Sequence, residues 1–515
     1  MSRKILCLAA ALILLTTLGG CVREPIEDNN EALPPLPMAQ VAWQAPERDY
    51  ITGEPGLWTL YLPGKNGLNL VAQHVQNIPG ILRAEELEAM TRELLSYPGN
   101  AQVDSLGGDI ELALAGEDAV ELSGGVVTVN LASSALGLGY RGLYTLSLAL
   151  AATLCEMESV RCVNVLVAGQ SVGLDTGEFL AMGSLTAHPG ENLPVLWEQM
   201  EAKRTPVGGD PSLTPLTSYM TLYFPLENGQ GITCENRTLT FPGQTARQMA
   251  STILENLSMG SMYLTGVPEM PDLMSMMTYE PLISELPDGG RMITLSFREG
   301  ADREWEEMGV DTACMAAAVC YSLTTFIPGT AGVAIRIGDR PLTVLNNGKF
   351  GDMTALGGTL RRSGFAPFLM GRTTVYLARG NVLAPLEMSV DRAKSDSPRA
   401  KLAALMEGPG AMAREEGMER TLPDLVREDD ILGIAIDGDV ILVNLSETFR
   451  SEIQAWGKED ETLLCYSMVN TLCAGSGAKK VCFFFEGEQV ETIAGTIYWA
   501  GTFDFNTGLC EESFG

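Results

Sequence analysis

The chain is 515 residues long, enough for about three domains of ordinary size. Hydrophobic residues make up 46% of it, which supports packed cores and excludes a wholly disordered chain. With 34 basic and 65 acidic residues the net charge is −31, which repels nucleic acid and anionic lipid headgroups. We therefore expect no nucleic-acid partner and no surface that lies flat on a bilayer.

The N-terminus has the features of an export signal followed by a lipid attachment site. A short positive region precedes an apolar run over residues 5–18, which is shorter than the roughly 20 residues that span a bilayer. The sequence Leu18-Gly19-Gly20-Cys21 then resembles the lipobox of bacterial lipoproteins. This resemblance implies removal of residues 1–20, a lipid on Cys21 and a position on the outer face of the cytoplasmic membrane. An ordinary signal peptide with a chance cysteine is the alternative.

Residues 21–54 are acidic and rich in proline, which predicts an extended tether between the lipid and the folded part. Beyond the tether the chain repeats one unit three times. Each unit opens on a short strand with a central tyrosine, and the tyrosines are 162 and 153 residues apart. These strands are Leu60-Tyr61-Leu62-Pro63, Leu222-Tyr223-Phe224-Pro225 and Val375-Tyr376-Leu377.

After each tyrosine strand the pattern predicts a helix, a hairpin, a second and apolar helix, and a further strand. The hairpin turns have residue types that suit the positive φ of tight turns: Ser123-Gly124, Asp288-Gly289 and Asp437-Gly438. The apolar helices are expected over 143–156, 312–325 and 462–473, and the strands over 163–167, 333–337 and 481–485. One spacing is 16 residues in every unit, from Thr153 to Gly169, from Ser322 to Gly338 and from Thr471 to Gly487.

These elements predict an α+β fold of three tandem, two-layer helix-on-sheet domains. The expected units are 55–202, 219–357 and 374–515, joined by linkers over 203–218 and 358–373. The apolar helices are nearly uncharged, as expected for helices that lie against a sheet.

Four motifs in the third unit carry a family resemblance: Leu405-Met406-Glu407-Gly408-Pro409, Val443-Asn444-Leu445-Ser446, Tyr466-Ser467-Met468-Val469-Asn470-Thr471-Leu472 and Val481-Cys482-Phe483-Phe484-Phe485-Glu486-Gly487. They resemble the GerMN family of sporulation and spore germination. The first unit shares Val129-Asn130-Leu131 and Thr153-Leu154, whereas the second has Thr294 at the asparagine position and Ser322 in place of threonine. The resemblance implies ring-building-motif-like modules on an exported lipoprotein of Gram-positive bacteria, without catalytic residues.

We interpret the motif positions as architectural. Asn444 and Ser446 lie where a strand ends, so their side chains can satisfy backbone groups there. Gly487 gives the following turn its freedom in φ. The full set of architectural positions is Asn130, Thr153, Gly169, Ser322, Gly338, Asn444, Ser446, Thr471 and Gly487.

The cysteines do not form a regular framework. Cys7 leaves with the signal and Cys21 takes the lipid, so an odd number remains, without a C-x-x-C pair. Most of the others lie in apolar segments, which favours buried thiols. One or two disulfides remain open as an alternative.

Three further motifs invite other functions. Gly169-Gln170-Ser171-Val172-Gly173 fits the G-x-S-x-G pattern, but a turn and strand follow it instead of the required helix, and a Ser–His pair would need His188 with Asp175. The glycines of residues 137–142 fit G-x-G-x-x-G, but the preceding strand ends too early for a dinucleotide site. Asp437-Gly438-Asp439 could touch calcium, but a hairpin turn explains it fully. We expect no cofactor and no metal.

The leading hypothesis is a non-enzymatic scaffold that docks other envelope or sporulation proteins while a lipid holds it at the membrane. Self-association stays open. A binding module for a cell-wall glycan or a small ligand is the second hypothesis, and a peptidoglycan or ester hydrolase is the third. Ser171 beside His188 in a deep pocket would favour the hydrolase, whereas exposed strand edges would favour the scaffold.

Overall fold

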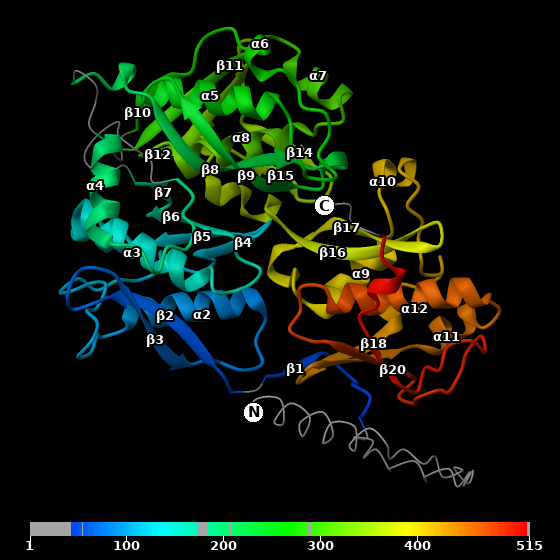
Figure 1. The fold of residues 1–515 in the computed structure, drawn as a ribbon. Helices are drawn as coiled ribbons and strands as arrows, with labels where there is room; N and C mark the ends of the chain where they lie inside the picture. The colour runs from blue at the N-terminus through cyan, green and yellow to red at the C-terminus, as the bar shows by residue number, and fades with distance from the viewer. Residues whose placement is uncertain (1–42, 54, 173–182, 205–208, 287–289, 512–515) are drawn as a thin grey trace, which may run out of the picture. The chain divides into compact units, whose positions relative to one another are not determined.

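The computed structural model describes residues 43–53, 55–172, 183–204, 209–286 and 290–511. The predicted lipid site at Cys21 and the predicted turn at Asp288-Gly289 lie outside these residues. From Ala45 onward the chain forms a unit of its own, in which one structural plan is repeated as three modules (Figure 1).

Module 1 consists of an opening hairpin, a four-stranded sheet and helices. The hairpin is β2 (Leu57–Pro63) and β3 (Leu70–Gln76), and the sheet has the order β4 (Val120–Ser123), β5 (Val126–Leu131), β6 (Cys162–Val167) and β7 (Gln170–Ser171). Strands β5 and β6 are parallel and the other neighbours are antiparallel. The helices are α2 (Arg83–Ser96), α3 (Gly139–Leu154) and α4 (Leu193–Arg204).

Module 2 repeats this order with β8 (Leu216–Pro225), β9 (Ile232–Phe241), α5 (Ala246–Ser258), α6 (Leu273–Met276), β10 (Leu282–Glu285), β11 (Arg291–Phe297), α7 (Ala301–Glu307), α8 (Thr312–Phe326), β12 (Thr330–Ile337) and β13 (Arg340–Pro341). A small hairpin of β14 (Val344–Asn347) and β15 (Gly351–Thr354) follows.

Module 3 contains β16 (Met370–Arg379), β17 (Val382–Asp391), α9 (Pro398–Glu407), α10 (Ala411–Glu415), β18 (Ile431–Asp437), β19 (Val440–Leu445), α11 (Glu447–Ile453), α12 (Lys458–Cys473), β20 (Lys480–Phe485) and β21 (Thr502–Asp504). Its sheet has a fifth strand, β1 (Tyr50–Thr52), which pairs with β18 in parallel.

The predicted α+β fold is confirmed, and each opening hairpin has a second strand that the sequence pattern did not predict. These strands are β3, β9 and β17, each antiparallel to its tyrosine strand. Charged residues inside β9 (Glu235 and Arg237) and Pro385 inside β17 lower the strand signal there. In modules 2 and 3 the missing prediction therefore has a compositional cause.

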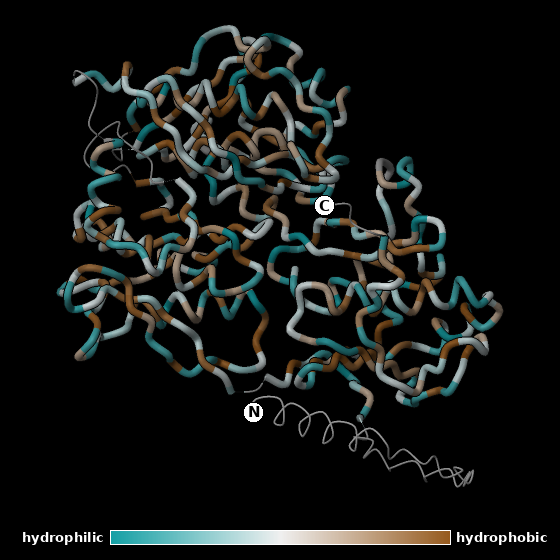
Figure 2. Tube along the Cα trace, viewed as in Figure 1, coloured by the Kyte–Doolittle hydropathy of each residue, from teal (hydrophilic) through white to brown (hydrophobic). Residues whose placement is uncertain are grey.

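The apolar helix of each module lies between the opening hairpin and the four-stranded sheet. Helix α8 contacts β8 on one side and β12 on the other, and α3 and α12 are placed in the same way. In module 3, Figure 1 shows α9 and α12 between the hairpin β16–β17 and the sheet strands β18 and β20. All side chains of α8 from Ala313 to Phe326 are buried, and Figure 2 shows hydrophobic residues gathered in the interiors. Burial on two sides explains why these helices carry so little charge.

One hydrogen bond ties this helix to the tyrosine strand in every module. A helix hydroxyl accepts the backbone N–H of the tyrosine at 2.9 Å in each case, with the pairs Thr153 and Tyr61, Ser322 and Tyr223, and Thr471 and Tyr376. All three hydroxyl residues are 0% exposed. The hydroxyl thus serves a strand N–H that would otherwise be buried without a partner.

The nine described cysteines outside the signal and lipid site are free thiols, and seven of them are buried. Burial raises the pKa of Cys162 and of Cys320 to about 12 each. Such thiols stay protonated at neutral pH and are poor nucleophiles.

We predict that Thr471→Val destabilises module 3 by about 1–3 kcal/mol, because valine keeps the shape and leaves the N–H of Tyr376 without an acceptor. Thr462→Val in the same helix is the control, since the Thr462 hydroxyl only donates to the carbonyl of Lys458 at an exposed site. The free energy of unfolding is measured in denaturant. Equal losses in the two variants would contradict the assigned role.

Candidate functional site: the junction between modules 1 and 2

The motif asparagines close equivalent turns in modules 1 and 3. Oδ1 of Asn130 accepts the N–H of Gly169 at 2.8 Å, and Oδ1 of Asn444 accepts the N–H of Gly487 at 2.9 Å. The two glycines have φ values of 77° and 85°, so the turn needs the left-handed region. The side-chain amide therefore acts as part of the backbone at this position.

Module 2 departs from this arrangement, and the strand register corrects the sequence alignment. Phe297 pairs with Ile337 as Leu131 pairs with Val167, which places Ser296 rather than Thr294 at the asparagine position. Gly338 is the first residue of its turn, and its N–H donates to the carbonyl of Phe297 at 2.9 Å. Module 2 has one residue more between the helix hydroxyl and the end of the strand. The same spacing of 16 residues therefore places Gly338 one position earlier in its turn than the glycines of modules 1 and 3.

Ser446 lies at the N-cap of α11, where it accepts the N–H of Phe449 at 3.3 Å. Its hydroxyl also donates to Oδ1 of Asp430 at 2.6 Å. The cap satisfies one of the free N–H groups at the start of the helix and fixes the exit of β19.

A segment ahead of module 1, residues 46–52, binds along the edge of module 3, and we call it the strap. Asp49 forms a bidentate ion pair with Arg399 at 2.6 and 2.8 Å and also accepts the N–H of Ile434. Nδ2 of Asn444 donates to the carbonyl of Pro46 at 3.1 Å. Gly433 is required here, since a Cβ on it would lie 2.5 Å from that carbonyl oxygen. The end of the predicted tether is therefore part of the sheet.

The serine of the G-x-S-x-G motif is engaged structurally. Ser171 is 6% exposed and its Oγ donates to the carbonyl of Phe326 at 3.2 Å. The ring nitrogens of His188 lie 3.0 Å from Thr186 Oγ1 and 2.9 Å from Glu191 Oε1. Ser171 and His188 thus have separate partners, and Asp175 lies outside the described residues.

The other two motifs are also accounted for by the backbone. Strand β5 ends at Leu131, well before the glycines of residues 137–142, which lie in a short 3-10 helix and the start of α3. Asp437 ends β18, and Gly438 and Asp439 form the two-residue turn to the antiparallel strand β19, one residue later than the predicted turn at Asp437-Gly438. In the part of the chain that the structure describes, no cluster of His, Cys, Asp or Glu could hold a metal ion.

A polar network joins the sheet of module 1 to the opening hairpin of module 2. Nδ2 of Asn164 on β6 donates to Thr221 Oγ1 on β8 at 3.0 Å, and Nδ2 of Asn236 on β9 donates to the same oxygen at 2.9 Å. Ser184 Oγ donates to Asn164 Oδ1 at 2.7 Å. Because these groups are buried, the bond from Asn164 to Thr221 fixes the relative position of the two modules, and the other two bonds hold its donor and its acceptor in place.

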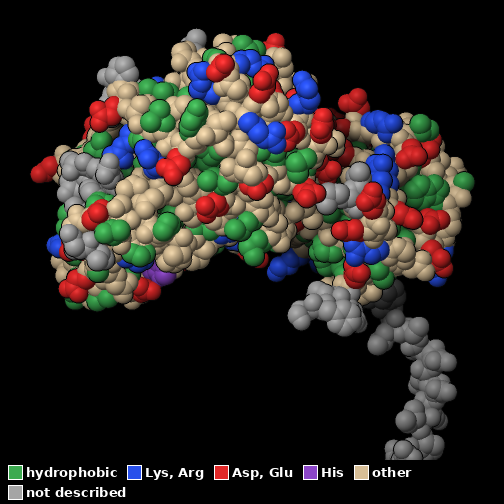
Figure 3. Space-filling view, turned by 90° about the horizontal axis from the view of Figure 1, so that it is seen from above, with side chains coloured by type: hydrophobic (Ala, Val, Ile, Leu, Met, Phe, Trp, Pro, Cys, Tyr) green, Lys and Arg blue, Asp and Glu red, His purple; other side chains and the backbone are tan. Residues whose placement is uncertain are grey.

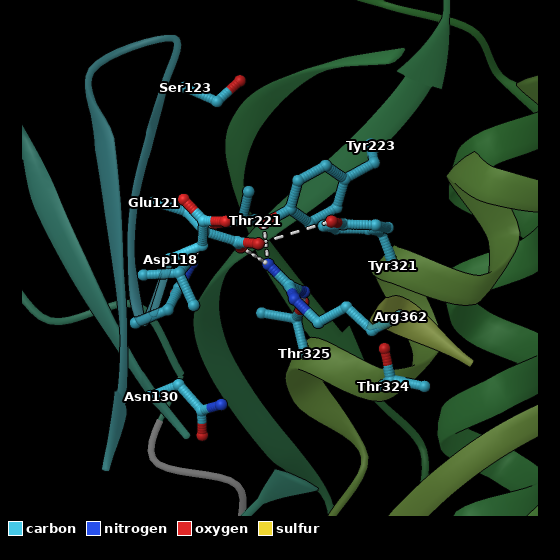
Figure 4. Close-up of polar contacts among 12 residues, drawn as sticks. Asp118, Glu121, Ser123, Asn130, Thr221, Tyr223, Tyr321, Thr324, Thr325 and Arg362 are labelled. Atoms are coloured by element: carbon cyan, nitrogen blue, oxygen red, sulfur yellow. Dashed lines mark hydrogen bonds and ion pairs between the residues drawn. The ribbon is translucent and has the colours of Figure 1, made fainter. Parts of the chain in front are cut away.

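A buried arginine from the second linker completes this junction (Figure 4). Arg362 pairs with Glu121 on β4 at 2.6 Å, donates to Thr325 on α8 and lies 3.9 Å from the ring centroid of Tyr321. Tyr223 forms a second aromatic wall at 5.6 Å. Residues of module 1, module 2 and the linker thus meet at one guanidinium group.

The electrostatics of the junction favour the paired, charged state. Burial alone would lower the pKa of Arg362, but the adjacent Glu121 carboxylate raises it above the usual range. Burial and the same carboxylate raise the pKa of Tyr321 well above its usual value. Both aromatic rings therefore stay neutral and face the cation through their π-systems.

A cleft of about 410 Å³ lies beside Arg362. Its walls come from the loop before β4, from β5 and the turn after β6, and from the linker. The lining includes Glu117, Asp118, Asn130, Gly169, Arg361 and Ser363. Sequence reasoning placed Arg362 in a passive linker over 358–373 and did not find this cleft; the pair Arg361-Arg362 in so acidic a chain was the available signal.

We predict that Glu121→Leu destabilises the junction by about 3–5 kcal/mol, because it leaves a buried guanidinium without its carboxylate. Adding Arg362→Met should recover most of this loss, since the uncompensated charge is then gone. Glu280→Ala, which breaks the exposed pair with Arg247, is the control and should cost less than about 1 kcal/mol. Denaturant unfolding measures all three, and additive losses in the double variant would contradict the assignment.

The C-terminal module matches a known family. Residues 374–491 match the family described as "Germane: Sporulation and spore germination". No curated protein matches the chain. Among the described residues, no helix is both long and apolar enough to cross a membrane.

Similar solved structures include the tandem GerMN domains of the sporulation protein GerM from Bacillus subtilis, at 16% identity over 57% of this chain and 100% of that chain, with a TM-score of 0.23. The first GerMN domain of the same protein is 17% identical over 27% of this chain and 98% of that chain, with a TM-score of 0.21. A putative lipoprotein from Clostridium perfringens is 18% identical over 26% and 87%, with a TM-score of 0.19. At such TM-scores the architecture rests on the described elements themselves.

Proposed function

We propose that the chain is a lipid-anchored envelope protein that docks other proteins in sporulation or spore germination, because residues 374–491 match the Germane family. The lipid on Cys21 would hold it at the outer face of the cytoplasmic membrane. The three modules would act as a non-enzymatic scaffold.

The proposal rests on whether the first strand of each sheet is covered by another part of the chain. In module 3 the strap pairs with β18. In module 1 the edge strand β4 is covered by the rest of the chain: Ser123 Oγ donates to the carbonyl of Met370, its carbonyl accepts the thiol of Cys234, and Glu121 binds Arg362. In module 2, β10 pairs with β11, and no other described strand pairs with it. An uncovered strand edge is a template for pairing with another chain.

The backbone groups that face this open edge can be assigned. The N–H of Leu286 donates to the carbonyl of Gly290, which sets the alternation of the antiparallel ladder. Ser284 therefore directs its backbone groups toward β11, whereas Ile283 and Glu285 present theirs to the open side. Leu282, at 58% exposed, adds apolar surface at the start of the strand.

The surface charge suits a partner with basic groups. Figure 3 shows Asp and Glu side chains spread over one face, with Lys and Arg among them, rather than gathered in one patch. The net charge of −31 favours encounter with basic surfaces and repels other acidic ones. Strand pairing would then supply the specific contact.

We predict that Glu285→Pro abolishes partner docking through β10 without unfolding module 2, because it removes an outward N–H and no bond to β11. Glu285→Ala is the matched control, since it removes the same carboxylate and keeps the N–H. Crosslinking in sporulating cells of the source organism, followed by identification of bound envelope proteins, measures docking. Recovery of no envelope protein with the wild-type chain would overturn the proposed function.

We predict that Cys21→Ala releases the protein from the membrane fraction and leaves the modules folded, since the thiol is the proposed lipid attachment site. Cys482→Ala, at a buried thiol of module 3, is the control that should stay membrane-bound. Fractionation with immunodetection gives the distribution. A Cys21→Ala protein that remains in the membrane fraction would refute the anchor.

A further inference from the structure

The amide of Asn444 has two uses in module 3. Its Oδ1 accepts the N–H of Gly487, which closes the turn after β20. Its Nδ2 donates to the carbonyl of Pro46 and so binds an extended stretch of polypeptide, the strap. One side chain therefore joins the module to a passing peptide.

In module 1 the equivalent side chain makes only the first of these contacts. Oδ1 of Asn130 accepts the N–H of Gly169, as Asn444 does with Gly487. Among the described residues, Nδ2 of Asn130 has no hydrogen-bond partner, and the residue lines the cleft of about 410 Å³ beside Arg362. In Figure 4 the Asn130 amide nitrogen lies on the side of the residue toward Thr325 and Arg362.

We propose that this cleft binds a short, extended peptide segment of a partner protein, with a backbone carbonyl bound to Nδ2 of Asn130 and a basic side chain near Glu117 and Asp118. The inference rests on the proposed docking function and names a second contact for it. The strap on module 3 is the structural precedent for a peptide carbonyl at this amide.

The charges of the cleft select a basic segment. The side chain of Asp118 is 84% exposed and approaches Arg392 only to 3.9 Å, so its charge is hardly neutralised. Glu117, next to it in the loop before β4, adds a second carboxylate. The Arg362 guanidinium on the opposite wall is already paired with Glu121. Arg361, which also lines the cleft and donates to the carbonyl of Ala331, adds one positive charge against these two carboxylates, so the net charge of the cleft is negative.

The cleft cannot reproduce strand addition as module 3 does. Ala119 in module 1 corresponds to Gly433 in module 3. Ala119 precedes Val120, which pairs with β5, and Gly433 precedes Ile434, which pairs with β19. At Gly433 a Cβ would lie 2.5 Å from the strap carbonyl, so the methyl group of Ala119 holds a peptide farther from the strand. Beyond Ala119, the edge of β4 is occupied by Arg362. Recognition in module 1 therefore depends on the side-chain amide and on charge, over a short segment.

The test uses the full chain and a fluorescent synthetic peptide with the sequence of residues 45–52, carrying Glu47→Gln and Asp49→Asn so that Arg48 is its one charged side chain. Fluorescence anisotropy measures its affinity. Asn130→Asp keeps the acceptor for Gly169 and removes the donor, and we expect about tenfold weaker binding, the effect of one hydrogen bond. The added carboxylate by itself would strengthen binding of a basic peptide, so a loss reports the missing donor.

Asn444→Asp is the matched control, because it makes the same change in module 3, where the strap already occupies the amide. We expect it to leave peptide affinity unchanged, and we expect Asp118→Asn to weaken binding and to reduce its dependence on salt. Equal affinity for wild type and Asn130→Asp, or absence of peptide binding, would overturn the inference. Envelope proteins that are still recovered by crosslinking in that case would leave the proposed docking function intact, so the two failures are distinguishable.

Discussion

The structure depends on an apolar helix that is buried on two sides. A helix between a hairpin and a sheet has no solvent-facing stripe, so its polar groups need partners inside the module. Thr153, Ser322 and Thr471 meet this need in the same way, by accepting a strand N–H from the opposite layer. The hydroxyl fixes the position of the helix along the tyrosine strand. This position determines which hydrophobic side chains of the two elements contact each other.

The segments outside the modules make buried and charge-paired contacts with them. Arg362 lies in a stretch without regular strands, yet it is 8% exposed and holds a carboxylate of another module. The strap has a short strand of three residues, yet Asp49 gives it a bidentate ion pair and a backbone contact. Both segments lie over the first strand of a sheet. The chain therefore protects the edges at β4 and β18 with its connections, whereas among the described strands β10 pairs with β11 alone.

The repeat was readable from sequence because its signals are local. Apolar helices, tight turns and the spacing from helix hydroxyl to turn glycine all lie within one module, and the structure places Thr153 and Thr471 in equivalent contacts. The alignment failed in module 2 at two places. One additional residue before the end of β12 displaces Gly338, and on β11 the asparagine position belongs to Ser296, two residues after Thr294. The second hairpin strands were missed because β9 contains charged residues that are buried only through tertiary contacts, such as Glu235 with Arg237.

The junction and the strap could not be predicted in this way, because their partners are distant in sequence. Arg362 and Glu121 are 241 residues apart, and the bond from Thr52 to the carbonyl of Ile436 spans 384 residues. Composition assigned the strap to an acidic tether and Arg362 to a linker. Composition does not indicate which side chain of a connecting segment becomes buried.

The two asparagines show how one motif position can serve both architecture and recognition. The turn uses only the oxygen of the amide, so the nitrogen remains available for whatever passes the end of the strand. In module 3 the chain's own strap takes that nitrogen, and Gly433 makes room for it. In module 1 the methyl group of Ala119 and the side chain of Arg362 exclude such a strand and leave a cleft instead. The same local geometry thus yields a closed edge in one module and an open site in another, and the difference follows from the residues that surround the amide.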